Sequence, residues 1–120
     1  MTVNRYDRVG EEIKRVLSET LREMKDPRIS PMTTILGVEV TSDLKWAKVR
    51  VSVYDQDDAV RKQTVEAMNR AAGFFAHELG QRMEIRSLPK FNFLLDDSIE
   101  YSVRISQILD TLNKDKNGGE

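Results

Sequence analysis

The amino-acid sequence predicts one α+β domain in which helices back a three-stranded sheet. Apolar residues recur at helical spacing over residues 9–24 and again over 60–83. Residues 34–41, 46–54 and 91–95 instead alternate apolar and polar positions, as strands with one buried face do. The expected order is therefore helix, strand, strand, helix, kink, helix, strand and a terminal helix.

The composition is that of an ordinary globular domain. The 120 residues are 39% hydrophobic and 32% charged, which is enough to bury a single core. Cysteine is absent, which excludes disulfides, thiolate metal sites and cysteine nucleophiles. The sequence contains no apolar run of about 18 residues, so we expect a cytoplasmic protein without membrane contact.

A first helix is predicted from an apolar stripe that ends near Asp26-Pro27, because a residue before proline is pushed out of the helical region. The stripe consists of Val9, Ile13, Val16, Leu17, Leu21 and Met24. At about 100° per residue, the charged residues separate onto two flanks. The basic flank carries Arg8, Lys14, Arg15, Arg22 and Lys25, and the acidic flank carries Glu12, Glu19 and Glu23. Arg8, Arg15 and Arg22 repeat every seventh residue, which fits either a row that follows a phosphate backbone or a solvated face with internal ion pairs.

The two strands that follow are predicted to pair as an antiparallel hairpin through a short turn over residues 42–45. The residues expected on the buried faces are Leu36, Val38 and Val40 in the first strand and Ala47, Val49, Val51 and Val53 in the second. Lys45, Lys48 and Arg50 then lie at the turn or on the outer face. There they either bind a partner or pair with Glu39 across the strands.

The tripeptide Ala71-Ala72-Gly73 interrupts the second helical region, which begins at Asp57-Asp58. Glycine costs about 1 kcal/mol relative to alanine inside a helix, so this tripeptide predicts a bend that does not dissolve the helix. The inward residues are expected to be Val60, Thr64, Val65, Ala67, Met68 and Ala71 before the bend and Phe75, Ala76, Leu79 and Met83 after it.

The end of the chain predicts a third strand and a terminal helix. Phe91, Phe93 and Leu95 mark the buried face of the strand. Asp97 or Ser98 caps the helix. Its inward residues are expected to be Tyr101, Ile105, Ile108, Leu109 and Leu112. Residues 1–112 thus form the domain, and residues 113–120 form a flexible tail.

The net charge of −1 conceals an asymmetry. Residues 1–95 carry 16 Lys/Arg against 14 Asp/Glu, whereas residues 96–120 carry 3 against 6. A near-neutral total counts against nucleic-acid binding, in which cations supply most of the affinity. Binding to nucleic acid therefore requires that the basic residues gather on one surface.

Five short motifs, in a consistent order over about residues 5–110, resemble the ribosome-binding factor A family. They are Arg8-Val-Gly-Glu-Glu-Ile-Lys-Arg-Val-Leu17, Asp26-Pro-Arg-Ile29, Val40-Thr-Ser-Asp-Leu-Lys-Trp-Ala-Lys-Val49, Ala71-Ala-Gly73, and Arg86-Ser-Leu-Pro-Lys-Phe-Asn-Phe93 followed by Asp97-Ser-Ile99. The resemblance implies a type II KH topology in which a helical kink of the form Ala-x-Gly replaces the usual Gly-x-x-Gly loop.

The same resemblance implies a non-enzymatic ribosome assembly factor. Members of that family bind free 30S small ribosomal subunits, assist late maturation of 16S rRNA and of its 5′ end, and act in the bacterial cytoplasm, notably in cold adaptation. We accordingly expect a monomer that contacts 16S rRNA, with no cofactor, metal or catalytic residue.

The candidate RNA-binding residues are the kink and the basic residues expected near it. They are Arg8, Arg15, Arg22, Arg28, Lys45, Lys48, Arg70, Ala71, Ala72, Gly73, Arg82, Arg86 and Lys90. Guanidinium groups and helix amides bind phosphate without reading bases, so we expect recognition of backbone and shape.

Two readings of other classes stay open. The near-zero net charge fits a protein–protein adaptor that uses the outer sheet face or the terminal helix. His77, the single histidine, fits a small hydrolase only if a carboxylate lies beside it. The pairs Asp57-Asp58 and Asp96-Asp97 are explained by helix capping. No phosphate-binding loop of the form G-x-x-x-x-G-K-[ST] or G-x-G-x-x-G is present.

Overall fold

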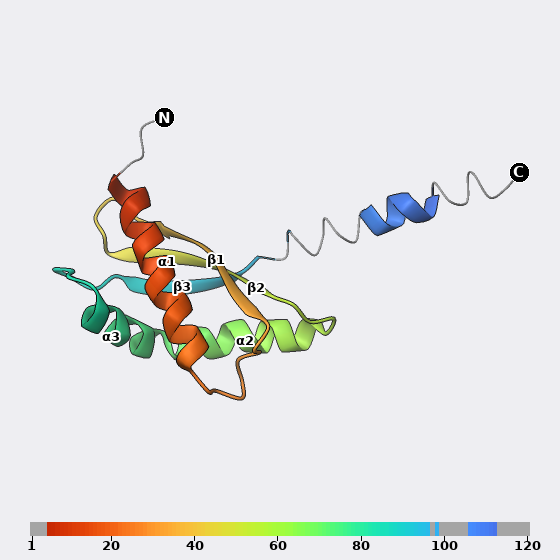
Figure 1. Ribbon diagram of the computed structural model, residues 1–120, viewed down its shortest axis with the longest axis horizontal. Coiled ribbons are helices and arrows are strands. Elements are labelled where there is room, and N and C mark those ends of the chain that lie inside the picture. The colour runs from red at the N-terminus through yellow and green to blue at the C-terminus, as the bar shows by residue number, and fades with distance from the viewer. Residues whose placement is uncertain (1–4, 97, 99–105, 113–120) are drawn as a thin grey trace, which may run out of the picture.

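The computed structural model describes residues 5–96, residue 98 and residues 106–112. Its elements are α1 (Arg5–Glu23), β1 (Thr33–Val40), β2 (Trp46–Val53), α2 (Asp58–Arg70), α3 (Ala72–Arg82) and β3 (Lys90–Leu95), as Figure 1 shows. A short helix also occupies residues 106–112. The predicted order is confirmed, including the type II KH order of helix, two strands, kinked helix pair and strand.

β2 is the central strand of the sheet. It pairs antiparallel with β1 and parallel with β3. A parallel pair needs a crossover connection, and α2 with α3 supplies it. Ala47, Val49, Val51 and Val53 are buried on the helix-covered face, whereas Trp46 and Lys48 are exposed on the other face. The sheet therefore has one face in the core and one open face.

β1 contains a bulge that alternation along the sequence did not reveal. Ile35 pairs with Val51 and Gly37 with Arg50, so Leu36 is an extra residue in β1. The prediction that Leu36 is buried is wrong, because the bulge gives its place in the core to Ile35, which is 3% exposed. Beyond the bulge, Val38 and Val40 pack on the core as predicted.

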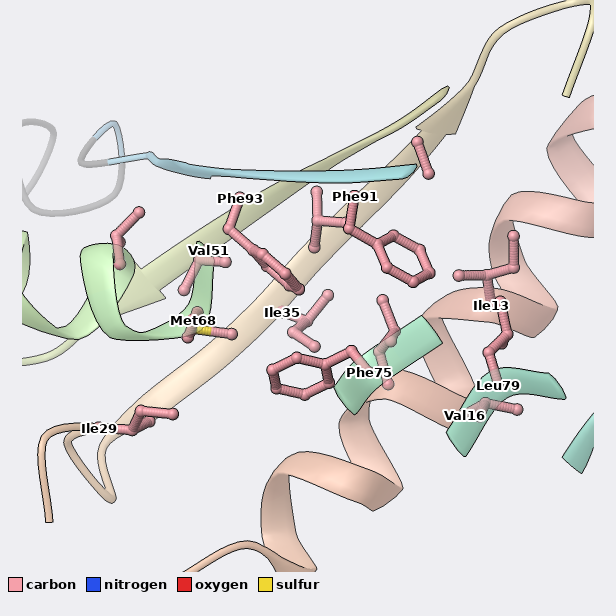
Figure 2. Close-up of a cluster of buried hydrophobic side chains, with 14 of the residues drawn as sticks. Ile13, Val16, Ile29, Ile35, Val51, Met68, Phe75, Leu79, Phe91 and Phe93 are labelled. Atoms are coloured by element: carbon pink, nitrogen blue, oxygen red, sulfur yellow. The ribbon is translucent and has the colours of Figure 1, made fainter. Parts of the chain in front are cut away.

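The core lies between the sheet and the three helices (Figure 2). The predicted stripe of α1 is confirmed, with Ile13, Val16 and Leu17 fully buried and the rest of the stripe packed against them. Gly10 allows the close approach of α1 to β1, because a Cβ there would lie 2.6 Å from the carbonyl oxygen of Val38. Phe75 and Phe93 meet at 5.1 Å between ring centroids and join α3 to β3.

The terminal helix differs from its prediction. Ile108, Leu109 and Leu112 are 50%, 54% and 58% exposed, because helix 106–112 lies apart from the sheet in Figure 1. Their predicted inward packing is therefore wrong. Tyr101, Ile105, the cap at Asp97 and the tail 113–120 fall outside the described residues. Within the described parts of the chain, no helix has the length and apolar character needed to cross a membrane.

Candidate nucleic-acid interface

The kink occurs at Ala71. α2 ends at Arg70 and α3 begins at Ala72, and the Ala71 N–H still donates to the carbonyls of Ala67 and Met68 at 3.0 and 3.1 Å. The Phe75 N–H donates to the Ala71 carbonyl at 3.1 Å. The hydrogen bonds of α2 thus end at the Ala71 N–H, and those of α3 begin at the Ala71 carbonyl. The predicted bend at this tripeptide is confirmed.

Gly73 lies in the first turn of α3, and its side-chain position is open. Its φ is negative, and a Cβ at this position would have no heavy atom within 4 Å. Neither backbone conformation nor packing within the described chain requires glycine here. α3 also begins without a side-chain cap and with no acidic residue in its first turn. The positive end of the α3 dipole is therefore presented with little side-chain cover.

A shallow hollow of about 660 Å³ lies on one side of the kink. Residues 24–28, which follow α1, form one wall, and Ala71 and Phe74 form the other. The hollow brings the segment after α1 next to the kink, although about 45 residues separate them in sequence. Two basic side chains, Lys25 and Arg28, lie at this hollow.

Arg28 and Arg70 both have carboxylate neighbours at this end of the molecule. Arg28 Nη2 lies 3.2 Å from Asp26 Oδ2, and the hydrogen bonds from Arg28 hold the pKa of Asp26 below its usual value. Arg70 Nη2 lies 4.0 Å from Glu66 Oε2. Both arginine side chains are more than half exposed. Such surface pairs are weak, so a phosphate can compete for these guanidinium groups.

The basic flank of α1 leads away from the same hollow. Arg8, Arg15 and Arg22 are exposed, and 14 residues of helix separate the first from the last, or about 21 Å. Arg15 donates to Glu19 at 3.0 Å. Within the described residues, Arg8 and Arg22 form no ion pair. Within this row, Arg15 is paired with Glu19, whereas the guanidinium groups of Arg8 and Arg22 face solvent.

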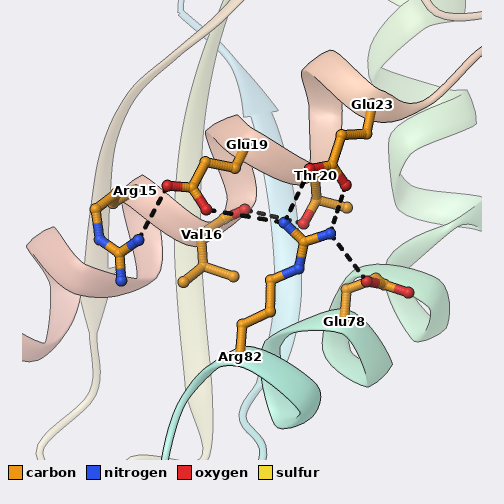
Figure 3. A network of polar contacts seen from close by, with 7 residues as sticks. All are labelled: Arg15, Val16, Glu19, Thr20, Glu23, Glu78 and Arg82. Atoms are coloured by element: carbon orange, nitrogen blue, oxygen red, sulfur yellow. Dashed lines mark hydrogen bonds and ion pairs between the residues drawn. The ribbon is translucent and has the colours of Figure 1, made fainter.

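Arg82 has a different environment from the other candidates. Its guanidinium lies among three carboxylates, at 2.5 Å from Glu23, 3.2 Å from Glu78 and 3.8 Å from Glu19 (Figure 3). Its side chain is 27% exposed. The acidic flank of α1 is therefore tied to α3, which fixes the helix that follows the kink. We infer that Arg82 positions α3, and its place in an RNA contact stays a prediction.

This cluster predicts a pH dependence of stability. The hydrogen bond from Arg82 lowers the pKa of Glu23 below 4.5, so the ionised carboxylate stabilises the fold above that pH. That contribution is lost as the pH falls through the lowered pKa. We expect Arg82→Met to lower Tm at pH 7, and the difference from wild type to shrink below about pH 4. Thermal melts by circular dichroism measure it, and an unchanged difference at low pH would contradict the assignment.

The remaining basic residues lie on the open sheet face and in the segments beside it. Arg50 lies 3.8 Å from Glu39 and 3.2 Å from Asp96, so the cross-strand pairing with Glu39 exists for this residue. Lys48 stands opposite Glu39 in the register. Lys45 is exposed in the turn, Lys90 at the start of β3, and Arg86 in the segment between α3 and β3. The predicted positions of Lys45 and Lys48 are confirmed, and their binding role stays a prediction.

The structure brings part of the candidate set together at one end of α1. Ala71 of the kink and Arg28 line the hollow, Arg70 acts electrostatically on Asp26 in its wall, and Arg22 is in the last turn of the neighbouring α1. Sequence reasoning left Lys25 out of the candidate set, although its place on the basic flank was a usable signal. His77 is exposed on α3. No group of three or more histidine, aspartate or glutamate side chains in the described chain is placed to hold a metal ion.

These features define a class of protein: a small α+β domain of type II KH topology, with a helical kink and basic side chains where a nucleic-acid loop would lie. Comparison with known proteins specifies the family. The sequence model described as Ribosome-binding factor A matches residues 5–109. The chain therefore belongs to the ribosome-binding factor A family.

Individual relatives agree with this assignment. Ribosome-binding factor A of Caldanaerobacter subterraneus is 46% identical over 111 residues, covering 92% of this chain and 90% of that protein. The solution structure of a Thermotoga maritima protein described as a putative ribosome binding factor A superposes with a TM-score of 0.67 at 32% identity, covering 78% and 91% of the two chains. A homology model of the Thermus thermophilus factor, fitted into a cryo-EM map of a 30S complex, gives 0.61 at 25% identity, covering 73% and 91%.

Proposed function

We propose that this protein binds the free 30S ribosomal subunit through 16S rRNA. The observation that carries the proposal is the meeting of the kink with the basic segment 24–28, which follows α1, at one hollow. Family membership and the 30S complex of the Thermus relative support the same partner. Cations on a protein surface bind phosphates in a folded RNA by position and shape.

We propose that the bound protein acts in subunit assembly, as the family resemblance implies. The protein holds 16S rRNA near its 5′ region during late 30S maturation and processing, and leaves before translation begins. It acts as a monomer in the cytoplasm, and the family resemblance supports a part in cold adaptation. It performs no chemistry itself, because its contribution is to stabilise one conformation of the rRNA.

The direct test is co-sedimentation of the purified protein with free 30S subunits. We expect binding at low salt and a steep loss of affinity as salt rises, because phosphate contacts release counterions. A protein–protein adaptor with an apolar interface would show little salt dependence. Absence of the protein from the 30S fraction at low salt would refute the proposed function.

Gly73→Ala separates the binding role of the kink from its structural role. Alanine favours the helix by about 1 kcal/mol and meets no atom within 4 Å, so we expect unchanged or slightly raised stability. The added methyl group stands where a phosphate backbone would approach α3, so we expect weaker 30S binding. Urea denaturation and co-sedimentation measure the two effects.

Gly10→Ala is the matched control for that variant. A Cβ there would lie 2.6 Å from a backbone oxygen of β1, so α1 must shift and stability should fall by about 1–3 kcal/mol. The two glycines thus have opposite predicted effects on stability. If Gly73→Ala binds 30S subunits as wild type does, the kink has only a structural role. The basic flank of α1 is then the RNA contact.

A further inference from the structure

Trp46 is a large aromatic side chain placed on the surface. It is the only tryptophan in the chain and is 50% exposed at the start of β2, whereas Phe75, Phe91 and Phe93 are buried. Its ring stands on the open face of the sheet, because the neighbouring Ala47 points into the core. The core therefore does not account for the residue type.

The backbone of Trp46 is held firmly by the hairpin turn. The Trp46 carbonyl accepts from the Thr41 N–H at 3.0 Å, and the Trp46 N–H donates to the Thr41 hydroxyl oxygen at 3.1 Å. The Asp43 carboxylate closes the turn, accepting from the Thr41 hydroxyl at 2.6 Å and the Lys45 N–H at 3.0 Å. These hydrogen bonds fix the backbone of Trp46, so little backbone conformational entropy is lost when its ring binds a partner.

Lys90 lies against this ring, and two further lysines are near Trp46 in the chain. Lys90 is opposite Trp46 in the register, and its Nζ lies 5.6 Å from the ring centroid. Lys45 precedes Trp46, and Lys48 lies on the same face of β2. Among the described residues, none of the three ammonium groups forms an ion pair. The nearby acids are Asp43, whose carboxylate is engaged within the turn, and Glu39, which stands opposite Lys48 and also pairs with Arg50.

A second shallow hollow lies between Trp46 and Lys90 and the kink. It has a volume of about 450 Å³ and is lined by Trp46, Lys90 and the Leu88-Pro89 segment on one side and by Ala72, Gly73 and Ala76 on the other. The open side-chain position of Gly73 borders it. Trp46 and the kink therefore line one hollow, and a chain of nucleotides lying in it would contact both.

We infer that Trp46 is a stacking platform for an unpaired base of the bound rRNA. The inference rests on the proposed function and specifies one contact within it. The base stacks on the indole, and the ammonium groups of Lys45, Lys48 and Lys90 neutralise the adjoining phosphates. Stacking of this kind tolerates any base, because every base has a π face.

Fluorescence tests the contact directly, because all tryptophan emission of this chain comes from Trp46. The probe is a single-stranded adenylate decamer at low salt, and an abasic decamer of the same length is its control. We expect the adenylate RNA to quench the emission and the abasic backbone to bind without comparable quenching. Equal quenching by both, or none by either, would overturn the inference.

Substitutions of Trp46 test the same contact on intact 30S subunits by co-sedimentation. Trp46→Ala should weaken 30S binding about tenfold or more, and Trp46→Phe should retain most of it. Tyr54→Ala is the matched control, because Tyr54 is an exposed aromatic just beyond the other end of β2 and should bind as wild type does. Melting curves confirm that each variant is folded.

The experiments distinguish failure of 30S binding from failure of the Trp46 stacking contact. Wild-type protein that does not bind 30S would refute the proposed function. Full 30S binding by folded Trp46→Ala would overturn the stacking contact alone. If Trp46→Ala loses 30S binding but the adenylate RNA does not quench the wild-type protein, Trp46 contacts a ribosomal protein. That result would also overturn the stacking contact.

Discussion

Reversing Arg8, Arg15 and Arg22 to glutamate is expected to abolish co-sedimentation with free 30S subunits at low salt. The three changes lower the formal net charge from −1 to −7, because each replaces +1 by −1. All three side chains are exposed along one flank of α1, so the substitutions leave the core intact. Repulsion of phosphate then replaces attraction along about 21 Å of helix.

The triple Arg→Lys variant is the control for this experiment, because it keeps the charge and changes only the shape of the cations. It should co-sediment at low salt. Replacing the arginines by alanine should reduce the slope of log affinity against log salt by about two to three, if each arginine contacts one phosphate. Wild-type binding by the glutamate triple would exclude the α1 flank from the interface.

Truncation of Phe75 to alanine is expected to have the largest effect on stability. Phe75 is fully buried and its ring lies 5.1 Å from that of Phe93, at the point where the kinked helix joins the sheet. Loss of a buried phenylalanine costs about 3–5 kcal/mol, a large part of the total for a domain of this size. Urea denaturation at pH 7 measures this loss.

Phe74→Ala is the matched control, because the neighbouring ring is 47% exposed. We expect it to cost no more than about 1 kcal/mol. Equal costs for the two variants would mean that the helix after the kink does not pack as the structure describes. The comparison therefore checks the packing that fixes the kink against the sheet.

The sequence predicts most of the fold because periodicity reports which face of an element is buried. The α1 stripe, the β2 alternation and the Asp57 cap of α2, whose carboxylate accepts from the Ala59 N–H at 2.9 Å, follow from local rules. The bulge at Leu36 depends on pairing with β2, which a single strand's pattern does not encode. The apolar spacing of Ile108, Leu109 and Leu112 predicts a helix, but it does not specify what the helix packs against.

The candidate site was predictable in part for the same reason. The kink and the basic flank are local patterns, whereas their meeting at the 24–28 segment depends on how α1 crosses the sheet. The environment of Arg82 could not be predicted from sequence, because its carboxylate partners Glu19 and Glu23 lie about 60 residues earlier in the chain. Proximity of basic residues in sequence could not distinguish this clamp from an RNA contact.

Chemical probing of 16S rRNA on free 30S subunits tests most directly whether the protein acts through rRNA. Backbone reactivity is compared without protein, with wild-type protein at saturation, and with the Arg8, Arg15 and Arg22 charge-reversal triple. We predict a group of 16S nucleotides near the 5′ region that wild-type protein protects and the triple does not. Identical reactivity profiles with and without bound wild-type protein would contradict the account, because binding would then occur through ribosomal proteins alone.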